Sequence, residues 1–118
     1  MSWQSLDEAF TLKENGVVKA DLTLFGKLAE AVLKQMEVTF RYRKGGVIES
    51  SERRIQPYHV GGISGGWYVI GHDLDRDGLR TFALQRIKGL QTSGILFERP
   101  VDFIIGRHLR GGVGVWTE

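Results

Sequence analysis

The stretch Gly66-Trp67-Tyr68-Val69-Ile70-Gly71-His72 decides the fold, together with a second stretch that runs from Arg80 to Ile87. Both stretches are rich in aromatic and β-branched residues, which is typical of strands. Glycine and serine precede the first stretch, and Asp75-Arg76-Asp77-Gly78 separates the two. These residues are typical of turns. The pattern therefore predicts an antiparallel hairpin, with Gly78 supplying a positive φ in its turn.

Working outward from this hairpin, the best helical pattern runs from Leu24 to Met36, where apolar residues recur at helical spacing. Asp21 or Thr23 is expected to cap it. Such a stripe favours packing against a sheet over binding a partner. Residues 1–23 are weakly patterned, and short strands are expected at Ala9–Leu12 and Val17–Leu22.

Four further strands are expected. Val38 to Lys44 alternates apolar and polar residues, as a half-buried strand does. Val47 to Gln56 is polar enough for an edge strand, and Pro57 should end its pairing before Tyr58-His59-Val60 begins the next strand. Ile87 to Thr92 is expected to be the last. Short strands with glycine at the corners predict a mostly β fold with one flanking helix, arranged as a small, strongly bent antiparallel barrel.

Composition limits the function. The 118 residues suit one domain, contain no cysteine and show no apolar run or signal sequence, so we expect a cytoplasmic protein without a membrane segment. Nine basic residues stand against five acidic ones between Val38 and Leu90, although the whole chain carries only +2. A positively charged β region favours an anionic ligand. The alternative for any single arginine is that it lies on a solvated strand face and binds no ligand.

Enzyme and metal motifs are weak. Gly62-Ile63-Ser64-Gly65-Gly66 matches a hydrolase elbow, but a strand is expected after it where that motif needs a helix. The run from Asp73 to Gly78 resembles half of a calcium loop, but Leu84 stands where the bidentate glutamate belongs. The three histidines lack metal-ligand spacing. We therefore expect no enzymatic activity, no cofactor and no metal.

Several of these segments together resemble the WYL domain family. The resemblance is carried by Tyr42-Arg43, by Arg53 with Pro57-Tyr58-His59-Val60, by Trp67-Tyr68-Val69, by the Arg80–Ile87 stretch and by Phe97 to Pro100. Val69 replaces the leucine that gives the family its name. The resemblance implies an Sm-like or SH3-like barrel and divides the chain into a connecting segment (1–23), the WYL domain (24–98) and a linker (99–118) toward a further domain outside this fragment.

The resemblance also implies a function. WYL domains are similar to one another in that they serve bacterial transcription regulators as ligand-sensing modules. The implied ligand is single-stranded nucleic acid or a nucleotide, in a basic and aromatic pocket. The residues that match this pocket are Arg80, Arg86, Tyr68, Arg43, Tyr42 and His59. The implied parent protein forms a homodimer and binds DNA through a helix-turn-helix domain outside this chain.

Alternatives remain for both the site and the function. Strand alternation places Arg80, Phe82, Leu84 and Arg86 on one face, unless a bend or bulge splits them. The rings of Trp67 and Phe82 favour the core, and Tyr68 is the better contact residue. As a function, the alternative is a protein-protein interaction or dimerisation module with no small ligand of its own, whose arginines form salt bridges to a neighbouring subunit or domain.

Overall fold

The computed structural model describes residues 19–63 and 65–103. It contains one helix, α2 (Lys19–Lys34), followed by the strands β1 (Met36–Tyr42), β2 (Ser51–Ile63), β3 (Gly66–Asp73), β4 (Gly78–Ala83) and β5 (Ile87–Leu96), with a 3-10 turn, η1 (Leu84–Arg86), between the last two. The strands form a single antiparallel sheet in the order β4-β3-β2-β1-β5. The expected mostly β fold with one helix is confirmed.

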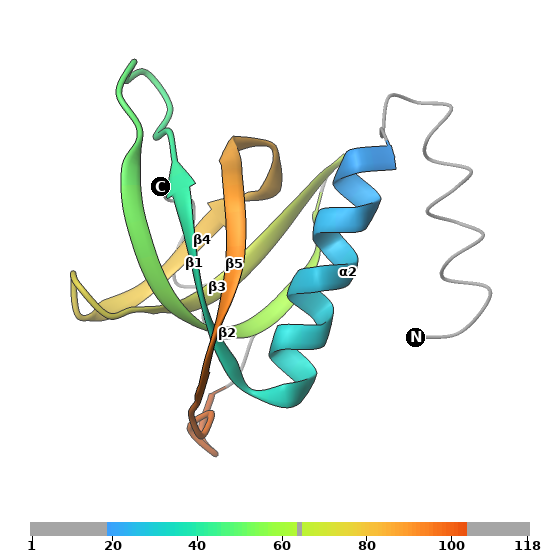
Figure 1. Cartoon of the computed structure of the whole chain (residues 1–118), viewed down its shortest axis with the longest axis vertical. Coiled ribbons are helices and arrows are strands. Elements are labelled where there is room, and N and C mark those ends of the chain that lie inside the picture. Colours follow the sequence, from blue (N-terminus) through green and yellow to red (C-terminus); the bar gives the residue numbers. More distant parts are fainter. Residues whose placement is uncertain (1–18, 64, 104–118) are drawn as a thin grey trace.

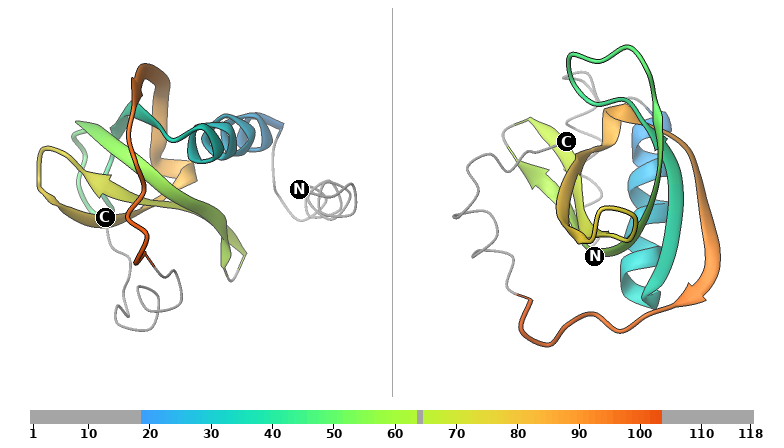
Figure 2. Two further views of the ribbon diagram at one scale, coloured as in Figure 1. Left: turned by 90° about the horizontal axis from the view of Figure 1, so that it is seen from below. Right: turned by 90° about the vertical axis from the view of Figure 1, so that its left-hand side faces the viewer.

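The sheet is strongly bent, and α2 lies against it (Figures 1 and 2). The helix contacts β2, β1, β5 and η1. Its inward stripe includes Leu28 and Ala31, which are fully buried, and Leu24 and Phe25 pack beside them. Because β4 and β5 are the two ends of the strand order, the sheet stays open between them in its hydrogen bonding. In the described part of the chain, no helix is long and apolar enough to cross a membrane.

The helix begins earlier than its apolar stripe indicates. It starts at Lys19, so the strand expected at Val17–Leu22 is wrong where it is described, and neither Asp21 nor Thr23 is an N-cap. Nothing from Lys19 to Phe25 breaks a helix, since the segment holds neither proline nor glycine. The strand expected at Ala9–Leu12 lies outside the described residues. Gln35 ends the helix with a φ of 54°.

The expected edge strand is also wrong, because β2 is the central strand of the sheet. It pairs with β1 from Ser51 to Ile55 and with β3 from Ile55 to Ile63. It runs through Pro57, which lies beyond the last β1 pair, where a missing N–H removes no bond to that strand. A register shift between Pro57 and His59 accommodates the ring.

The strand expected from Arg80 to Ile87 is divided. β4 ends at Ala83, and η1 carries the chain through Leu84–Arg86 to β5. Arg80 and Arg86 therefore lie on different elements and do not share a strand face. In the turn before β4, Asp77 and not Gly78 has the positive φ, at 49°. Aspartate tolerates this conformation better than most residues.

The strand β5 is longer than expected, and it is irregular. It continues past Thr92 to Leu96. Its pairing with β1 shifts register twice, between Met36 and Val38 and between Thr39 and Arg41. Gly89 and Gly94 have φ values of 66° and 82°, which only glycine adopts readily.

The core lies between the sheet and α2. Phe40, Tyr42 and Phe82 pack edge to face, with ring centroids 5.0 to 6.1 Å apart. Arg53 lies over the last two rings and forms a buried ion pair with Asp73, at 3.3 Å. Tyr42, Arg53 and Phe82 all belong to segments that carried the sequence resemblance. Their contacts, with the ion pair to Asp73, join β1, β2, β3 and β4.

Candidate ligand-binding surface

Arg43 and Arg86 meet where β1 ends and η1 ends. The backbone N–H of Arg43 donates to the carbonyl oxygen of Arg86 at 3.3 Å. In return, Arg86 Nη1 donates to the carbonyl oxygen of Arg43 at 3.5 Å, a long bond. The guanidinium lies against Gly45, where an added Cβ would be 2.9 Å from Nη1. The two arginines predicted from distant parts of the sequence are therefore neighbours.

Other cations surround this pair, and we call the five of them the basic surface: Arg41, Arg43, Lys44, Arg86 and Lys88. Arg41 and Lys88 are partners in the β1–β5 register. Alternation along β1 turns Arg41 and Arg43 to the exposed face, away from Phe40 and Tyr42 in the core.

The basic surface is not neutralised within the described part of the chain. No carboxylate there comes within 4 Å of any of its five side chains, whereas Lys34, Arg53, Arg54 and Arg76 all form ion pairs. Glu52 is the register partner of Arg41 but makes no ion pair with it. Unpaired like charges held this close raise the local potential, which attracts an anion.

His59 and Tyr68 meet at a second place, above Gly61. Their ring centroids are 5.9 Å apart. An added Cβ on Gly61 would be 3.0 Å from His59 Nε2 and 3.3 Å from the Tyr68 hydroxyl, so both polar atoms converge over this glycine. Burial raises the pKa of the Tyr68 phenol. Burial first, and the charge of Arg99 second, lower the pKa of the His59 imidazole below its usual 6.5.

Arg80 projects from a different face of the sheet than Tyr68. It is the β4 partner of Gly71, whereas Tyr68 is the partner of Ala83. Because these positions differ in parity, Arg80 and Tyr68 project from opposite faces of the sheet. Arg80 Nη1 donates to the carbonyl oxygen of Leu79 at 3.2 Å. The structure therefore brings together Arg43 with Arg86 and His59 with Tyr68, and it places Arg80 on the face of the sheet opposite to Tyr68.

The aromatic rings are less available than expected. Tyr42 is fully buried, and its hydroxyl accepts a hydrogen bond from the Ala83 N–H at 2.9 Å. Tyr68 is only 8% exposed. Trp67 packs on Phe25, with ring centroids 4.6 Å apart. Tyr42 and Tyr68 therefore lack the open faces on which bases stack, and Trp67 is partly buried, so the charges are the more accessible part of the site.

Sequence reasoning missed the partners of Asp73. This carboxylate is fully buried and pairs with Arg53 and with Arg76, at 3.3 and 3.5 Å. Its Oδ1 also accepts the N–H groups of Asp75 and Arg76, both at 3.0 Å. The residue that opened the apparent calcium loop thus organises a turn and an ion pair. Across the described residues, no cluster of three histidine or acidic side chains could hold a metal ion.

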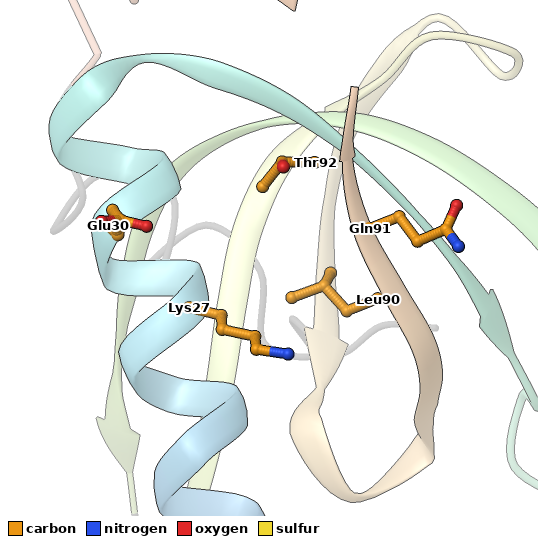
Figure 3. Close-up of a pocket in the computed structure, with 5 residues that line it drawn as sticks. All are labelled: Lys27, Glu30, Leu90, Gln91 and Thr92. Carbon is orange, nitrogen blue, oxygen red and sulfur yellow. The ribbon is translucent and has the colours of Figure 1, made fainter. Parts of the chain in front are cut away.

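A cavity between α2 and β5 was also missed (Figure 3). It has a volume of about 460 Å³ and is lined by Lys27, Glu30, Leu90, Gln91 and Thr92. Leu90 and Thr92 point toward the helix, and Gln91 points to the other side of the strand. The residues that line it come from a helix and a strand far apart in the sequence, and no sequence motif marks them.

Comparison with known families gives one clear match. The sequence model of the WYL domain matches residues 23–92, which is more than half of the chain. The matched range contains the basic surface and both residues above Gly61. It ends before Phe97 and Arg99.

Individual relatives agree with this match. Protein PafB of Mycobacterium tuberculosis (strain H37Rv) is 36% identical over 72 residues, or 61% of this chain and 21% of the relative. Protein PafB of Mycobacterium leprae is 37% identical over 60 residues, or 51% of this chain and 18% of the relative. The chain thus spans about a fifth of these relatives. The solved structure of proteasome accessory factor B/C (PafBC) of Arthrobacter aurescens matches 70% of this chain and 13% of its own, with a TM-score of 0.64 and 22% identity, which shows a shared fold.

Proposed function

Because the chain belongs to the WYL domain family, we propose that it is the regulatory, non-enzymatic, ligand-sensing domain of a bacterial transcription regulator. Its ligand is anionic, either single-stranded nucleic acid or a nucleotide. The observation that carries this proposal is the basic surface, where five cations gather without an ion pair among the described residues. Arg43 and Arg86 lie at its centre.

The chemistry of these side chains suits phosphate. A guanidinium offers several N–H donors in a plane and can grip two phosphate oxygens at once. Of the Arg86 donors, one makes the long bond to the Arg43 carbonyl. Lys44 and Lys88 add mobile charges beside them. Successive phosphates of a single strand would find several cations here, and counterion release would make binding weaken as salt rises.

The other predicted residues take different parts in this proposal. His59 and Tyr68 supply a polar contact above Gly61 rather than an open stacking platform. Arg80 would act from the opposite face of the sheet, and Tyr42 supports the surface from the core. Ligand binding regulates the parent protein if the ligand favours one arrangement of neighbouring domains over another. The DNA-binding helix-turn-helix and the homodimer interface belong, in this proposal, to the parent protein.

The test is fluorescence anisotropy of a labelled single-stranded oligonucleotide titrated with the 118-residue chain, with a duplex of the same sequence as competitor. We expect binding that prefers the single strand and is lost in the double variant Arg43→Ala/Arg86→Ala. The matched control is Arg54→Ala/Lys34→Ala, which removes the same charge from two exposed residues that already have acidic partners. Equal affinity of the two double variants would sink the proposal.

A dimerisation module is the second candidate, and one observation favours it. Leu33, Ile95 and Leu96 are apolar, yet 82%, 53% and 70% exposed. Leu96 is the β5 partner of Met36, which follows α2 closely, so these residues gather near one end of the molecule. Sedimentation of the chain over a range of concentrations tests this function. A mass that rises with concentration, and that Leu96→Asp returns to the monomer value, would favour it.

A further inference from the structure

The loop between β1 and β2 extends past the rest of the sheet (Figure 1), and we call its residues, 43–50, the tip loop. Tyr42 and Ser51 are the last paired residues of the two strands below it. Val47 and Ile48 lie in the tip loop, where they are 47% and 90% exposed. Water therefore surrounds most of the isoleucine, which leaves apolar surface that a ligand can cover.

The tip loop lies next to the basic surface. The backbone N–H of Val47 donates to the Lys44 carbonyl oxygen at 3.1 Å. Gly46 has a φ of 81°, which is typical of the third residue of a type II turn. In the same turn Gly45 lies against the Arg86 guanidinium, since an added Cβ would be 2.9 Å from its Nη1. The apolar pair therefore follows the cations by one turn and is held beside them.

The two sides of the tip loop carry opposite charges. Arg43 and Lys44 lead into it, whereas Glu49 follows Ile48 and Glu52 stands at the start of β2. A phosphate is attracted to the first side and repelled by the second. A polyanion on the basic surface is therefore expected to place its backbone on the Arg43 side, which leaves its other groups free to reach the tip.

We propose that Ile48, supported by Val47, contacts the base faces of a single-stranded nucleic acid whose phosphates lie on the basic surface. Unpaired bases expose flat, largely apolar faces that proteins cover with side chains, whereas a duplex stacks those faces inside. Isoleucine is among the apolar side chains that proteins insert against bases. Ile48 thus supplies the open apolar contact that the buried rings of Tyr42 and Tyr68 do not.

This inference deepens the proposed function and rests on it, because it requires an anionic strand on the basic surface. It divides the work of the site: the cations bind any polyanion, and the tip loop selects one with unpaired bases. The exposed apolar group of Leu33, Ile95 and Leu96 does not share this place. Leu96 pairs with Met36 at one end of β1, and the tip loop extends from Tyr42 at the other end.

The experiment compares two labelled oligomers of equal length by fluorescence anisotropy with the 118-residue chain. One is a thymidine oligonucleotide, and the other carries the same phosphates on tetrahydrofuran abasic residues. We expect the unmodified chain to bind the oligonucleotide about tenfold more tightly, because only bases can cover Ile48. The slope of log K against log [salt] should be equal for the two oligomers, since their phosphates are the same.

Three variants that keep every charge test the contact. Ile48→Ser should lower the affinity for the oligonucleotide about tenfold and leave the affinity for the abasic oligomer unchanged. Ile48→Trp should raise the affinity for the oligonucleotide alone, because an indole stacks on a base. The matched control is Ile95→Ser, which makes the same change at another exposed isoleucine. Because Ile48 is exposed, its variants should unfold at the same temperature as the unmodified chain.

The outcomes separate this inference from the proposed function. Equal affinity of the unmodified chain for the two oligomers overturns the inference. So does a loss in Ile48→Ser that also appears with the abasic oligomer or in Ile95→Ser. In either case the proposed function still stands if Arg43→Ala/Arg86→Ala abolishes the binding of both oligomers. If the unmodified chain binds neither oligomer, the proposed function fails and the inference fails with it.

Discussion

The hydroxyl of Tyr42 accepts a hydrogen bond from the backbone N–H of Ala83 at 2.9 Å, and this contact joins β1 to the point where β4 gives way to η1. The phenol lies in the core, and Ala83, whose N–H it binds, is the last residue of β4. Everything after Ala83, including Arg86, is placed by that junction. A tyrosine expected to stack on a ligand therefore positions the basic surface from within.

Tyr42→Phe tests this role. The variant keeps the ring packing against Phe40 and Phe82 but leaves the Ala83 N–H without this partner. We expect it to lower the free energy of unfolding by about 1–2 kcal/mol. Urea denaturation measures the change. Unchanged stability would contradict this role for the hydroxyl.

The buried pair of Arg53 and Asp73 should dominate stability. Their side chains are 3% and 0% exposed. Asp73→Ala removes the carboxylate that pairs with the buried Arg53 guanidinium and the acceptor of two backbone N–H groups, so we expect a loss of about 3–5 kcal/mol. Asp75→Ala removes only an exposed partner of Arg54 and should change stability by less than about 1 kcal/mol. Similar losses in the two variants would be inconsistent with this account.

Stability should depend on pH through His59. Its folded pKa is lowered, chiefly by burial and then by Arg99, so between that pKa and the ordinary 6.5 the unfolded chain binds more protons than the folded one. Stability is then complete above the unfolded value and falls as pH drops through 6.5 toward the folded value. The groups that face the imidazole in the described structure are the Tyr68 phenol and the Arg99 guanidinium. The unfolding temperature should therefore vary less with pH across this window in His59→Gln than in the unmodified chain. An unchanged pH profile would mean that another group causes the effect.

The salt dependence of oligonucleotide binding should report how many cations contact phosphate. Each one that is removed should reduce the slope of log K against log [salt] by about 0.7 for a single strand. Arg43→Ala and Arg86→Ala, each measured as a single variant that still binds at low salt, should therefore each lower the slope by about 0.7. The anisotropy titration repeated at several salt concentrations measures this slope. A loss of affinity with the slope intact would mean that neither arginine touches a phosphate.

Two glycines should respond in opposite ways to alanine. At Gly71 an added Cβ would be 2.6 Å from the Gln56 carbonyl oxygen, and backbone cannot yield as a side chain can, so Gly71→Ala should unfold or strongly destabilise the domain. Gly26 lies inside α2 with nothing within 4 Å of the added atom. Gly26→Ala should stabilise the domain by about 1 kcal/mol. Denaturation midpoints of the pair decide this directly.

The sequence predicted the hairpin, the helix and the mostly β fold because local signals specify them. Aromatic and β-branched residues mark Gly66–Asp73, and an apolar stripe marks α2. The prediction failed where pairing between strands distant in the sequence determines the structure. Polar residues from Val47 to Gln56 indicated an edge, but β2 is central in the strand order, paired with β1 from Ser51 to Ile55 and with β3 from Ile55 onward. One of the charged residues in that segment, Arg53, is buried and pairs with Asp73.

The candidate site was predicted in its residue types but not in its arrangement. Alternation grouped Arg80 with Arg86, and η1 separates them, because a 3-10 turn replaces the end of the strand. Arg43 and Arg86 meet through backbone bonds between distant segments, which no local pattern encodes. The contact of Arg99 was missed for a similar reason: its Nη1 donates to the carbonyl oxygen of Tyr58, a residue 41 positions earlier.

The two left-handed glycines of β5 bear on solubility. A ten-residue edge strand presents a row of backbone groups to which another chain can add, and long, flat edges of this kind template aggregation. Gly89 and Gly94 break the strand's regular repeat at two points, each beside a register shift against β1. An incoming strand could match only a few residues before losing register. We therefore expect this long edge to be a poor template for fibril growth.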